Sequence, residues 1–278
     1  MKMVWMTAGI LVMLVNSGFA ADPVEESRSW TEQFAVTASA PVLEIQNIWG
    51  DVRVLPGRNG EISVKIEERR WAPNQVLYER SLELLKLDIQ AGDEGVSLYV
   101  GEREHRWHRK DPCRGCRLEY QFEVHVPVST VVNVSTVNDG QVEVSGISGL
   151  VSAGNVNGPI SISAVKNCGE LENINGAVTV GFASAPGKDC HIETINGDIT
   201  LEMPKGAGLD VAMDLFNGRM VSEFEVDPLA IPAKVEHTRS DGRNHYRIAQ
   251  PAGVRIAGGG PTFTISSMNG DIRIQKTQ

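Results

Sequence analysis

The sequence predicts a mainly β protein, in which a β-solenoid of stacked two-strand coils follows an N-terminal β-rich region that contains one helix. A short motif recurs along the 278 residues, as in TINGDITLEM at 194–203 and SMNGDIRI at 267–274. Within each copy, apolar and polar residues alternate, as expected of a β-strand with one buried face. The copies are also nearly evenly spaced, which is typical of a repeat architecture.

Each copy is interpreted as a strand, a tight turn and a second strand. The residues before the turn glycines, taken as position zero, are Trp49, Asp139, Asn157, Asn175, Asn196, Asn217 and Asn269. The residues three and five positions later are apolar in every copy except at Ser222, and the preceding strand is mostly apolar four and six positions earlier. Asn and Gly tolerate the positive φ that tight turns between strands require.

The spacing of the turns favours stacked coils. The glycines from Gly140 to Gly218 follow one another at intervals of 18, 18, 21 and 21 residues. Because a unit of this size cannot bury its own apolar face, consecutive units are expected to stack over residues 130–225, with their asparagines aligned at one corner. The same alternation also allows an antiparallel meander or a sandwich of hairpins, and this alternative stays open.

Composition divides the rest of the chain. Residues 21–129 are expected to form the N-terminal β-rich part and residues 130–278 the solenoid, with an excursion at about 226–260 that is rich in Pro, Gly and charge. The strand pair after this excursion is expected to cap the C-terminal end. A helix is expected at 74–85, because this segment lacks the alternation of its neighbours and follows Pro73.

The chain is expected to be exported. Residues 1–20 combine a basic start, an apolar run and small residues, which is the pattern of a signal peptide cleaved after Ala20. An uncleaved anchor is the alternative, although the run is shorter than the roughly 20 apolar residues of a membrane span. No other run is long enough for a span, and a formal net charge of −9 argues against nucleic-acid binding. A periplasmic, extracellular or other envelope location is therefore predicted.

The repeats resemble those of a known family. The segments VSTVNDGQVEVSG, TINGDITLEM and GGGPTFTISSMNGDIRI are similar to the repeats of the bacterial putative-adhesin β-strand-repeat family, known as domain of unknown function number 4097. The resemblance spans most of the mature chain. It implies an envelope-facing binding protein, and it brings neither a demonstrated ligand nor catalytic residues. The sequence departs from the pattern at VNDG, which is one residue longer, and in the 102–117 loop.

The 102–117 loop holds the densest group of reactive side chains. His105, His108, Cys113 and Cys116 are residue types that bind zinc in structural sites. Only four residues separate the two pairs, however, and an exported chain with an even number of cysteines is expected to form disulfides. We therefore predict a Cys113–Cys116 disulfide and no cofactor; metal binding, redox catalysis and free thiols are the alternatives.

The same loop is basic. Its candidate ligand-binding residues are Arg106, Trp107, Arg109, Lys110 and Arg114. On an acidic protein, a basic tip with one aromatic residue is suited to an anionic glycan, with an affinity that falls as salt screens the charges. An envelope protein is an equally good partner, and a solvated hairpin without any ligand is the alternative.

A second disulfide is predicted from the repeat itself. Cys168 lies seven residues before Asn175, and Cys190 lies six residues before Asn196, so the two cysteines take nearly the same place in consecutive coils. Neighbouring strands lie about 4.8 Å apart. The expected Cα–Cα distance of roughly 6 Å is within the range of a disulfide, whereas two buried free thiols are the alternative.

An enzymatic function is not expected. A polysaccharide-active β-helix enzyme would need a cluster of acids on one outward face, and the outward residues after the turns, such as Glu143, Ser161 and Thr179, do not form one. The motifs Gly-x-Ser-x-Gly and His-Glu-x-x-His are absent from the sequence. The predicted function is therefore non-enzymatic binding or scaffolding at the envelope. A polysaccharide-active enzyme and a metal-binding protein that uses the 105–116 loop are the alternatives.

We expect the mature protein to begin at Ala21. Intact-mass analysis and N-terminal sequencing of protein recovered from the producing cells measure this directly. An Ala20→Arg variant serves as the control, because a large charged residue at the cleavage site blocks the peptidase. Wild-type protein that keeps residues 1–20 and stays with the membrane fraction would show that the segment is an anchor.

Overall fold

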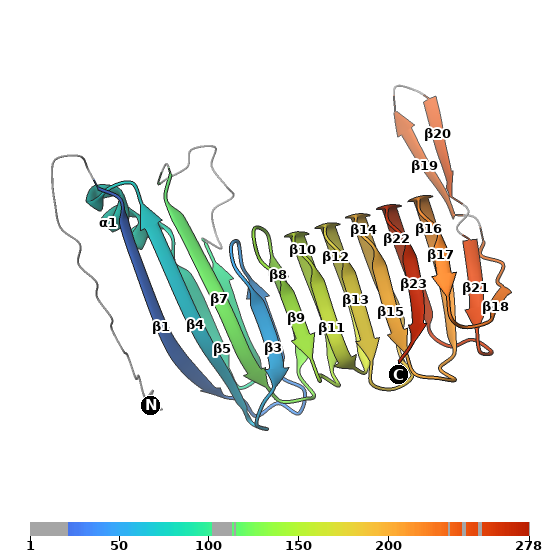
Figure 1. Cartoon of the computed structure of the whole chain (residues 1–278), viewed down its shortest axis with the longest axis horizontal. Coiled ribbons are helices and arrows are strands. Elements are labelled where there is room, and N and C mark those ends of the chain that lie inside the picture. Colours follow the sequence, from blue (N-terminus) through green and yellow to red (C-terminus); the bar gives the residue numbers. More distant parts are fainter. Residues whose placement is uncertain are drawn as a thin grey trace.

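The computed structural model consists of two large mixed β-sheets and a separate two-stranded sheet. It describes residues 22–101, 113, 115–232, 234–240, 243–249 and 252–277. The two large sheets lie face to face along the long axis of the molecule, and the two-stranded sheet projects from one end (Figure 1). Over these residues, no helix has the length and apolar character of a membrane span.

The spatial order of the strands differs from their order in the chain. The ten-stranded sheet contains, from edge to edge, β1 (Val24–Ala35), β4 (Glu61–Ala72), β7 (Arg117–Val126), β3 (Val52–Pro56), β9 (Val142–Ser145), β11 (Ile160–Val165), β13 (Val178–Phe182), β15 (Ile199–Met203), β23 (Ile272–Lys276) and β17 (Met220–Ser222). The eleven-stranded sheet contains, from edge to edge, β18 (Val226–Pro228), β21 (Ala252–Ile256), β16 (Leu209–Asn217), β22 (Thr262–Asn269), β14 (Cys190–Asn196), β12 (Asn167–Asn175), β10 (Leu150–Asn157), β8 (Val131–Thr136), β2 (Val42–Gln46), β6 (Gly95–Val100) and β5 (Leu87–Gly92). The two-stranded sheet pairs β19 (Lys234–Ser240) with β20 (Arg243–Ala249).

The chain alternates between the two large sheets at each Asn-Gly corner. Strand β10 lies in one sheet and β11 in the other, and the same alternation holds for β12 with β13 and β14 with β15. Within each sheet, these strands pair in parallel with the equivalent strand of the next repeat. An antiparallel meander of these repeats is therefore wrong, because Asn-Gly links strands of different sheets rather than the two strands of a hairpin.

The prediction that the last strand pair caps the C-terminal end is also wrong. Strand β22 lies between β14 and β16, and β23 lies between β15 and β17. The segment after β17 leads to β18 and to the antiparallel strand β21, which pairs with β16, before the chain returns to fill the gap. The motif of the last repeat resembles its neighbours, so its position in the stack does not follow from its position in the sequence.

The asparagines form a ladder along the corner, as predicted. Each side-chain amide donates to the amide oxygen of a neighbouring repeat, over 2.9–3.2 Å. The order of the ladder is Asn138, Asn157, Asn175, Asn196, Asn269 and Asn217. Asp139, which was counted as position zero of its copy because it precedes Gly140, does not align with these asparagines. Asn138 takes that position, and Asp139 is an additional residue with a φ of 50°.

The corner glycines are required by the close approach of neighbouring repeats. A Cβ atom at Gly158 would overlap the carbonyl oxygen of Gly140, and one at Gly197 would overlap that of Gly176. The other members of this column meet the same obstacle, and they are Gly140, Gly176, Gly218 and Gly270. Positive φ, which the sequence suggested as the reason, applies to Gly158 and Gly176 but not to Gly197 or to the corner asparagines.

The aspartate of the Asn-Gly-Asp motif holds the next repeat. The Asp198 carboxylate accepts a hydrogen bond from the backbone N–H of Asp271 at 2.9 Å, and Asp271 accepts from the backbone N–H of Arg219 at 3.1 Å. Arg273 also donates to Asp198, at 2.6 Å. The Arg273 hydrogen bond, followed by the backbone N–H, lowers the pKa of Asp198 below its usual value.

The core lies between the two sheets. The residues three and five positions after the corner are fully buried in most repeats, for example Val178, Val180, Ile199 and Leu201. They pack in one continuous cluster with the inward side chains of the other sheet. Burying these apolar faces is the main stabilising term, because a single repeat has too little surface to bury alone.

The helix α1 (Gln75–Leu84) lies within the predicted range 74–85. Asn74 caps its N-terminus, since its side chain accepts a hydrogen bond from the backbone N–H of Leu77 at 2.9 Å. The helix packs against β4, where the buried Arg70 donates to the backbone oxygens of Ser81 and Leu85. The Leu85 carbonyl lies at the C-cap, where helical carbonyl groups have no partner within the helix, and the Ser81 carbonyl also accepts the backbone N–H of Leu85 at 2.9 Å.

We expect the close approach at the corner to make Gly197→Ala strongly destabilising. The added Cβ must displace a backbone oxygen of the next repeat, so we expect a loss of about 3 kcal/mol or more in the free energy of unfolding. Urea unfolding measures the change. Gly92→Ala is the matched control, since nothing lies within 4 Å of the added atom. Equal, small losses for both variants would contradict the proposed role of the column.

Candidate binding surface

The outer face of the eleven-stranded sheet is acidic in its central part. Two rows of side chains point outward along β2, β8, β10, β12, β14, β22 and β16, and the parallel register sets each residue beside its equivalent. We call them the acidic rows. The first is Glu44, Asn133, Ser152, Glu170, His191, Thr264 and Ala212; the second is Gln46, Ser135, Gly154, Glu172, Glu193, Ser266 and Asp214. None of these positions holds Lys or Arg.

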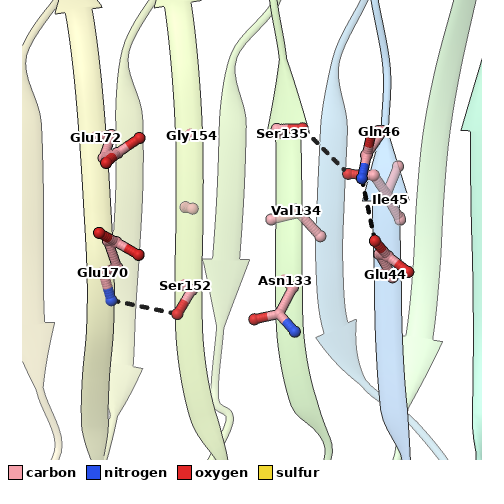
Figure 2. A pocket seen from close by; sticks show the side chains of 11 residues that line it. Glu44, Ile45, Gln46, Asn133, Val134, Ser135, Ser152, Gly154, Glu170 and Glu172 are labelled. Atoms are coloured by element: carbon pink, nitrogen blue, oxygen red, sulfur yellow. Dashed lines mark hydrogen bonds between the residues drawn. The ribbon is translucent and has the colours of Figure 1, made fainter.

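A shallow hollow of about 230 Å³ lies within the acidic rows. Small side chains of β8 and β10, such as Ser135, Ser152 and Gly154, form its floor. Figure 2 shows the carboxylates of Glu170 and Glu172 on one side of this floor and Glu44 with Gln46 on the other. The hollow arises because Gly154 and the serines are shorter than the glutamates of the strands beside them.

The polar contacts leave most of these carboxylates available. Glu44 accepts hydrogen bonds from Gln46 at 3.0 Å and from Ser97 at 3.1 Å. The Glu193 carboxylate lies 3.7 Å from the ring of His191. Over the described residues, no arginine or lysine forms an ion pair with Glu170, Glu172 or Asp214. A ligand with positive charge therefore meets carboxylates that are not already neutralised.

The arrangement is suited to binding rather than to catalysis. The hollow offers carboxylate, hydroxyl and amide groups at an open surface, whereas catalysis needs a nucleophile or base oriented by a second group in a site that excludes water. Within the part of the chain that the structure describes, no group of three or more His, Cys, Asp or Glu side chains is placed to hold a metal ion.

The opposite face carries more balanced charge. On the ten-stranded sheet, Arg53 pairs with Glu143 at 3.3 Å, and Arg273 pairs with Asp198 at 2.6 Å. Between these pairs, the outward residues are short and hydroxylated, as at Ser161 and Thr179. The two faces of the molecule therefore differ in electrostatic character, although the same repeats build both.

A buried charged network beneath α1 serves the fold. Glu68 accepts hydrogen bonds from Arg70 at 3.0 Å, from Arg28 at 2.6 Å and from the hydroxyl of Tyr120 at 2.8 Å. Burial, together with the Glu68 carboxylate, raises the pKa of the Tyr120 hydroxyl. Burial and the hydrogen bond to Glu26 raise the pKa of Tyr78 to about 12. Both hydroxyls therefore remain protonated at neutral pH and act as donors within a satisfied network.

The loop residues predicted to bind a ligand lie outside the described part of the chain. These residues are Arg106, Trp107, Arg109, Lys110 and Arg114, and the two histidines of the alternative metal site, His105 and His108, lie outside it as well. Cys113 and Cys116 form a disulfide with a Cα–Cα distance of 5.4 Å, as predicted. In this state, neither sulfur is a thiolate, so the disulfide removes half of the candidate zinc ligands.

The second predicted disulfide joins neighbouring strands of the stack. Cys168 on β12 is bonded to Cys190 on β14, with a Cα–Cα distance of 5.4 Å. Cys168 lies opposite Val151, and an irregularity in the pairing of β10 with β12 absorbs the one-residue offset seen in the sequence. Both cysteines are buried, so this bond ties two repeats together within the core.

The acidic rows are the feature that sequence reasoning missed. The outward positions after each Asn-Gly corner, which were the ones considered from the sequence, hold no acidic cluster, whereas these carboxylates precede the corner and lie on the other sheet. The signal was present, because the residues three positions before the corner include Glu172, Glu193 and Asp214. Glu44 and Glu170 are far apart in the chain, and only the stacking order brings them to opposite sides of one hollow.

Comparison with known proteins gives only distant matches. No family model and no curated protein matches the chain. The chain is similar in structure to a putative cell adhesion protein from Clostridium sporogenes (10% identity, TM-score 0.40, covering 92% of this chain and 100% of that one). It is also similar to a putative adhesin from Bacteroides fragilis (11%, 0.35, 90% and 97%) and a putative lipid binding protein from Parabacteroides distasonis (10%, 0.21, 92% and 97%).

The family expected from the repeats stays a prediction, because no family model matches the chain. At these identities and TM-scores, we infer no ligand or activity from any of the three structures.

We expect the two disulfides to differ in their contribution to stability. Replacing Cys168 and Cys190 by Ala should lower the free energy of unfolding by about 3 kcal/mol, because this bond joins residues 22 apart. The same change at Cys113 and Cys116, which are 3 residues apart, should cost about half as much. Urea unfolding of the two double variants measures both. A larger loss for the loop pair would contradict this ranking.

Proposed function

We propose that the protein is an exported, non-enzymatic binding or scaffold protein of the cell envelope. It contacts its partner through the outer face of the eleven-stranded sheet. The observation that carries this proposal is the hollow in the acidic rows, where Glu170 and Glu172, which no described arginine or lysine neutralises, border a floor of small side chains. Such a surface recognises a partner by charge and shape over an area, and it requires no cofactor.

The architecture in this proposal is the β-solenoid of stacked two-strand coils. The alternation of the chain between two sheets and the parallel register of equivalent strands support this interpretation. The coils occupy residues 130–278, with the excursion at about 226–260, and the N-terminal β-rich part occupies residues 21–129. A stiff stack of this kind suits a protein that displays a surface.

The envelope location follows from the sequence pattern of residues 1–20, and the disulfides add support. Disulfides persist in oxidising compartments outside the cytoplasm. Both disulfides, Cys113–Cys116 and Cys168–Cys190, would be stable there.

A protein partner suits the acidic rows better than an anionic glycan does. Carboxylates such as Glu170 and Glu172 repel a polyanion, whereas lysine and arginine side chains of a protein can pair with them. The anionic-glycan hypothesis stays with the loop residues Arg106, Trp107, Arg109, Lys110 and Arg114, as a separate prediction. No observation on the described residues supports the alternative function, an enzyme that acts on polysaccharides.

We expect an envelope protein to lie against the hollow in the producing cells. A photoreactive benzoylphenylalanine at Asn133, an exposed residue of the hollow, should give a discrete cross-linked adduct. The same group at Ser161, exposed on the opposite sheet, is the matched control and should not give it. Gel mobility and mass spectrometry identify the adduct. Identical adducts from both positions, or none from Asn133 in folded, exported protein, would refute the proposed surface.

A further inference from the structure

A continuous stripe of apolar side chains runs beside the acidic rows. The residue immediately before each corner asparagine, or before its equivalent Trp49, points outward on the same sheet. We call these residues the apolar stripe. In spatial order they are Ile48, Val137, Val156, Ile174, Ile195, Met268 and Phe216. Every repeat contributes an apolar side chain, although outward positions on a solvated sheet face are usually polar.

The register makes these residues immediate neighbours. Asn173 pairs with Thr194 and Asn175 with Asn196, so Ile174 lies beside Ile195 between these pairs. The corresponding pairs of the next two strands set Met268 between Ile195 and Phe216. Parallel strands lie about 4.8 Å apart, so the stripe is about 29 Å long.

Three of the seven stripe residues are exposed to solvent, and the other four, Ile48, Val137, Val156 and Ile195, are half-buried. The exposed fraction is 40% at Ile174, 50% at Met268 and 78% at Phe216. One edge is bordered by the asparagine ladder and the other by the second acidic row, with Glu172, Glu193 and Asp214. Contiguous exposed apolar surface of this kind, rimmed by polar residues, is typical of an interaction site.

The bordering charge selects among the possible occupants. A second copy packed stripe against stripe would bring like carboxylates together, and an anionic lipid surface would be repelled in the same way. A partner with an apolar face flanked by lysine or arginine would instead bury the stripe and pair with carboxylates such as Glu172 and Asp214, which form no ion pair with arginine or lysine over the described residues. Charge complementarity therefore favours a basic, amphipathic partner.

The spacing of the stripe selects a helix. Side chains on one face of an α-helix recur about every 5.4 Å along its axis, close to the 4.8 Å spacing of the stripe. Side chains on one face of an extended strand recur about every 6.7 Å, which mismatches the stripe by about 2 Å at each step. A helix of about 19 residues covers its full length.

We propose that the apolar stripe and the adjacent carboxylates form the docking site for an amphipathic α-helix of a partner protein, with lysine or arginine beside its apolar face. This inference deepens the proposed function and rests on it, because it assigns the partner chemistry of the same sheet face. The helix lies across the strands, along the corner of the stack, and its basic residues reach Glu172, Glu193 and Asp214.

A model peptide tests this proposal without a known partner. The probe is a labelled 19-residue peptide of Leu and Lys, with leucines at the spacing of one helical face, and fluorescence anisotropy measures its binding. We expect the double variant Phe216→Ser/Met268→Ser to weaken binding at least tenfold. The matched control is Val76→Ser/Val221→Ser, whose residues are 74% and 51% exposed and lie outside the stripe. It should bind as the wild type does.

The charge contribution is tested separately. Glu172→Gln/Glu193→Gln should weaken binding several-fold at low salt and reduce its dependence on salt. Glu202→Gln, on the opposite sheet, is the control. A peptide of the same composition, rearranged so that the leucines share no face, should bind at least tenfold more weakly.

Three results would overturn the helix docking site. They are equal binding of the two peptides, equal binding by the stripe and control variants, and association of the protein with itself that the stripe variant abolishes. If any of these is found while the adduct at Asn133 is still formed, only the helix proposal fails. If the adduct is also absent, the proposed function fails with it.

Discussion

The close backbone approach at the corner is the constraint on which the rest of the structure depends. The carbonyl oxygen of each corner glycine occupies the space that a Cβ atom of the next glycine would need. This contact fixes where one repeat lies on the next, and the asparagine ladder and the carboxylate of Asp198 then secure the same position. Because a slip of one residue would turn every inward side chain outward, a single register is strongly favoured.

A fixed register converts a sequence motif into surface rows. Once Asn175 lies beside Asn196, every position counted from the corner is repeated along the stack at the spacing of the strands. The inward positions become the core, and the outward positions become the acidic rows and the apolar stripe. The function proposed for this face is therefore a property of the stacking, since no single repeat contains a site.

The sequence predicted the parts of the structure that depend on local pattern. The alternation located the strands, the corner asparagines located the ladder, and the offset between Cys168 and Cys190 located a disulfide. The stacking order could not be read in the same way. Strand β22 lies between β14 and β16. The motifs of the repeats are so similar that the sequence does not show which two strands it pairs with.

The candidate site was predictable only in part, for the same reason. Glu44 and Glu170 share a hollow through the pairing of β2, β8, β10 and β12, which the motif spacing does not reveal. Asp139 shows at a single residue how far the sequence could predict the alignment of the repeats. Its place before Gly140 made it position zero of that copy, whereas the hydrogen bond from Asn157 reaches Asn138.

The apolar stripe and the acidic rows have to be understood together. Exposed apolar residues on a stiff, regular sheet favour association between copies, and such surfaces are a hazard in proteins built from repeats. Glu172, Glu193 and Asp214 border this stripe with like charge, which opposes the approach of a second copy at neutral pH. The same carboxylates attract a basic partner. The charge pattern thus acts against the commonest wrong partner and in favour of the proposed one, and specificity of this kind needs both effects.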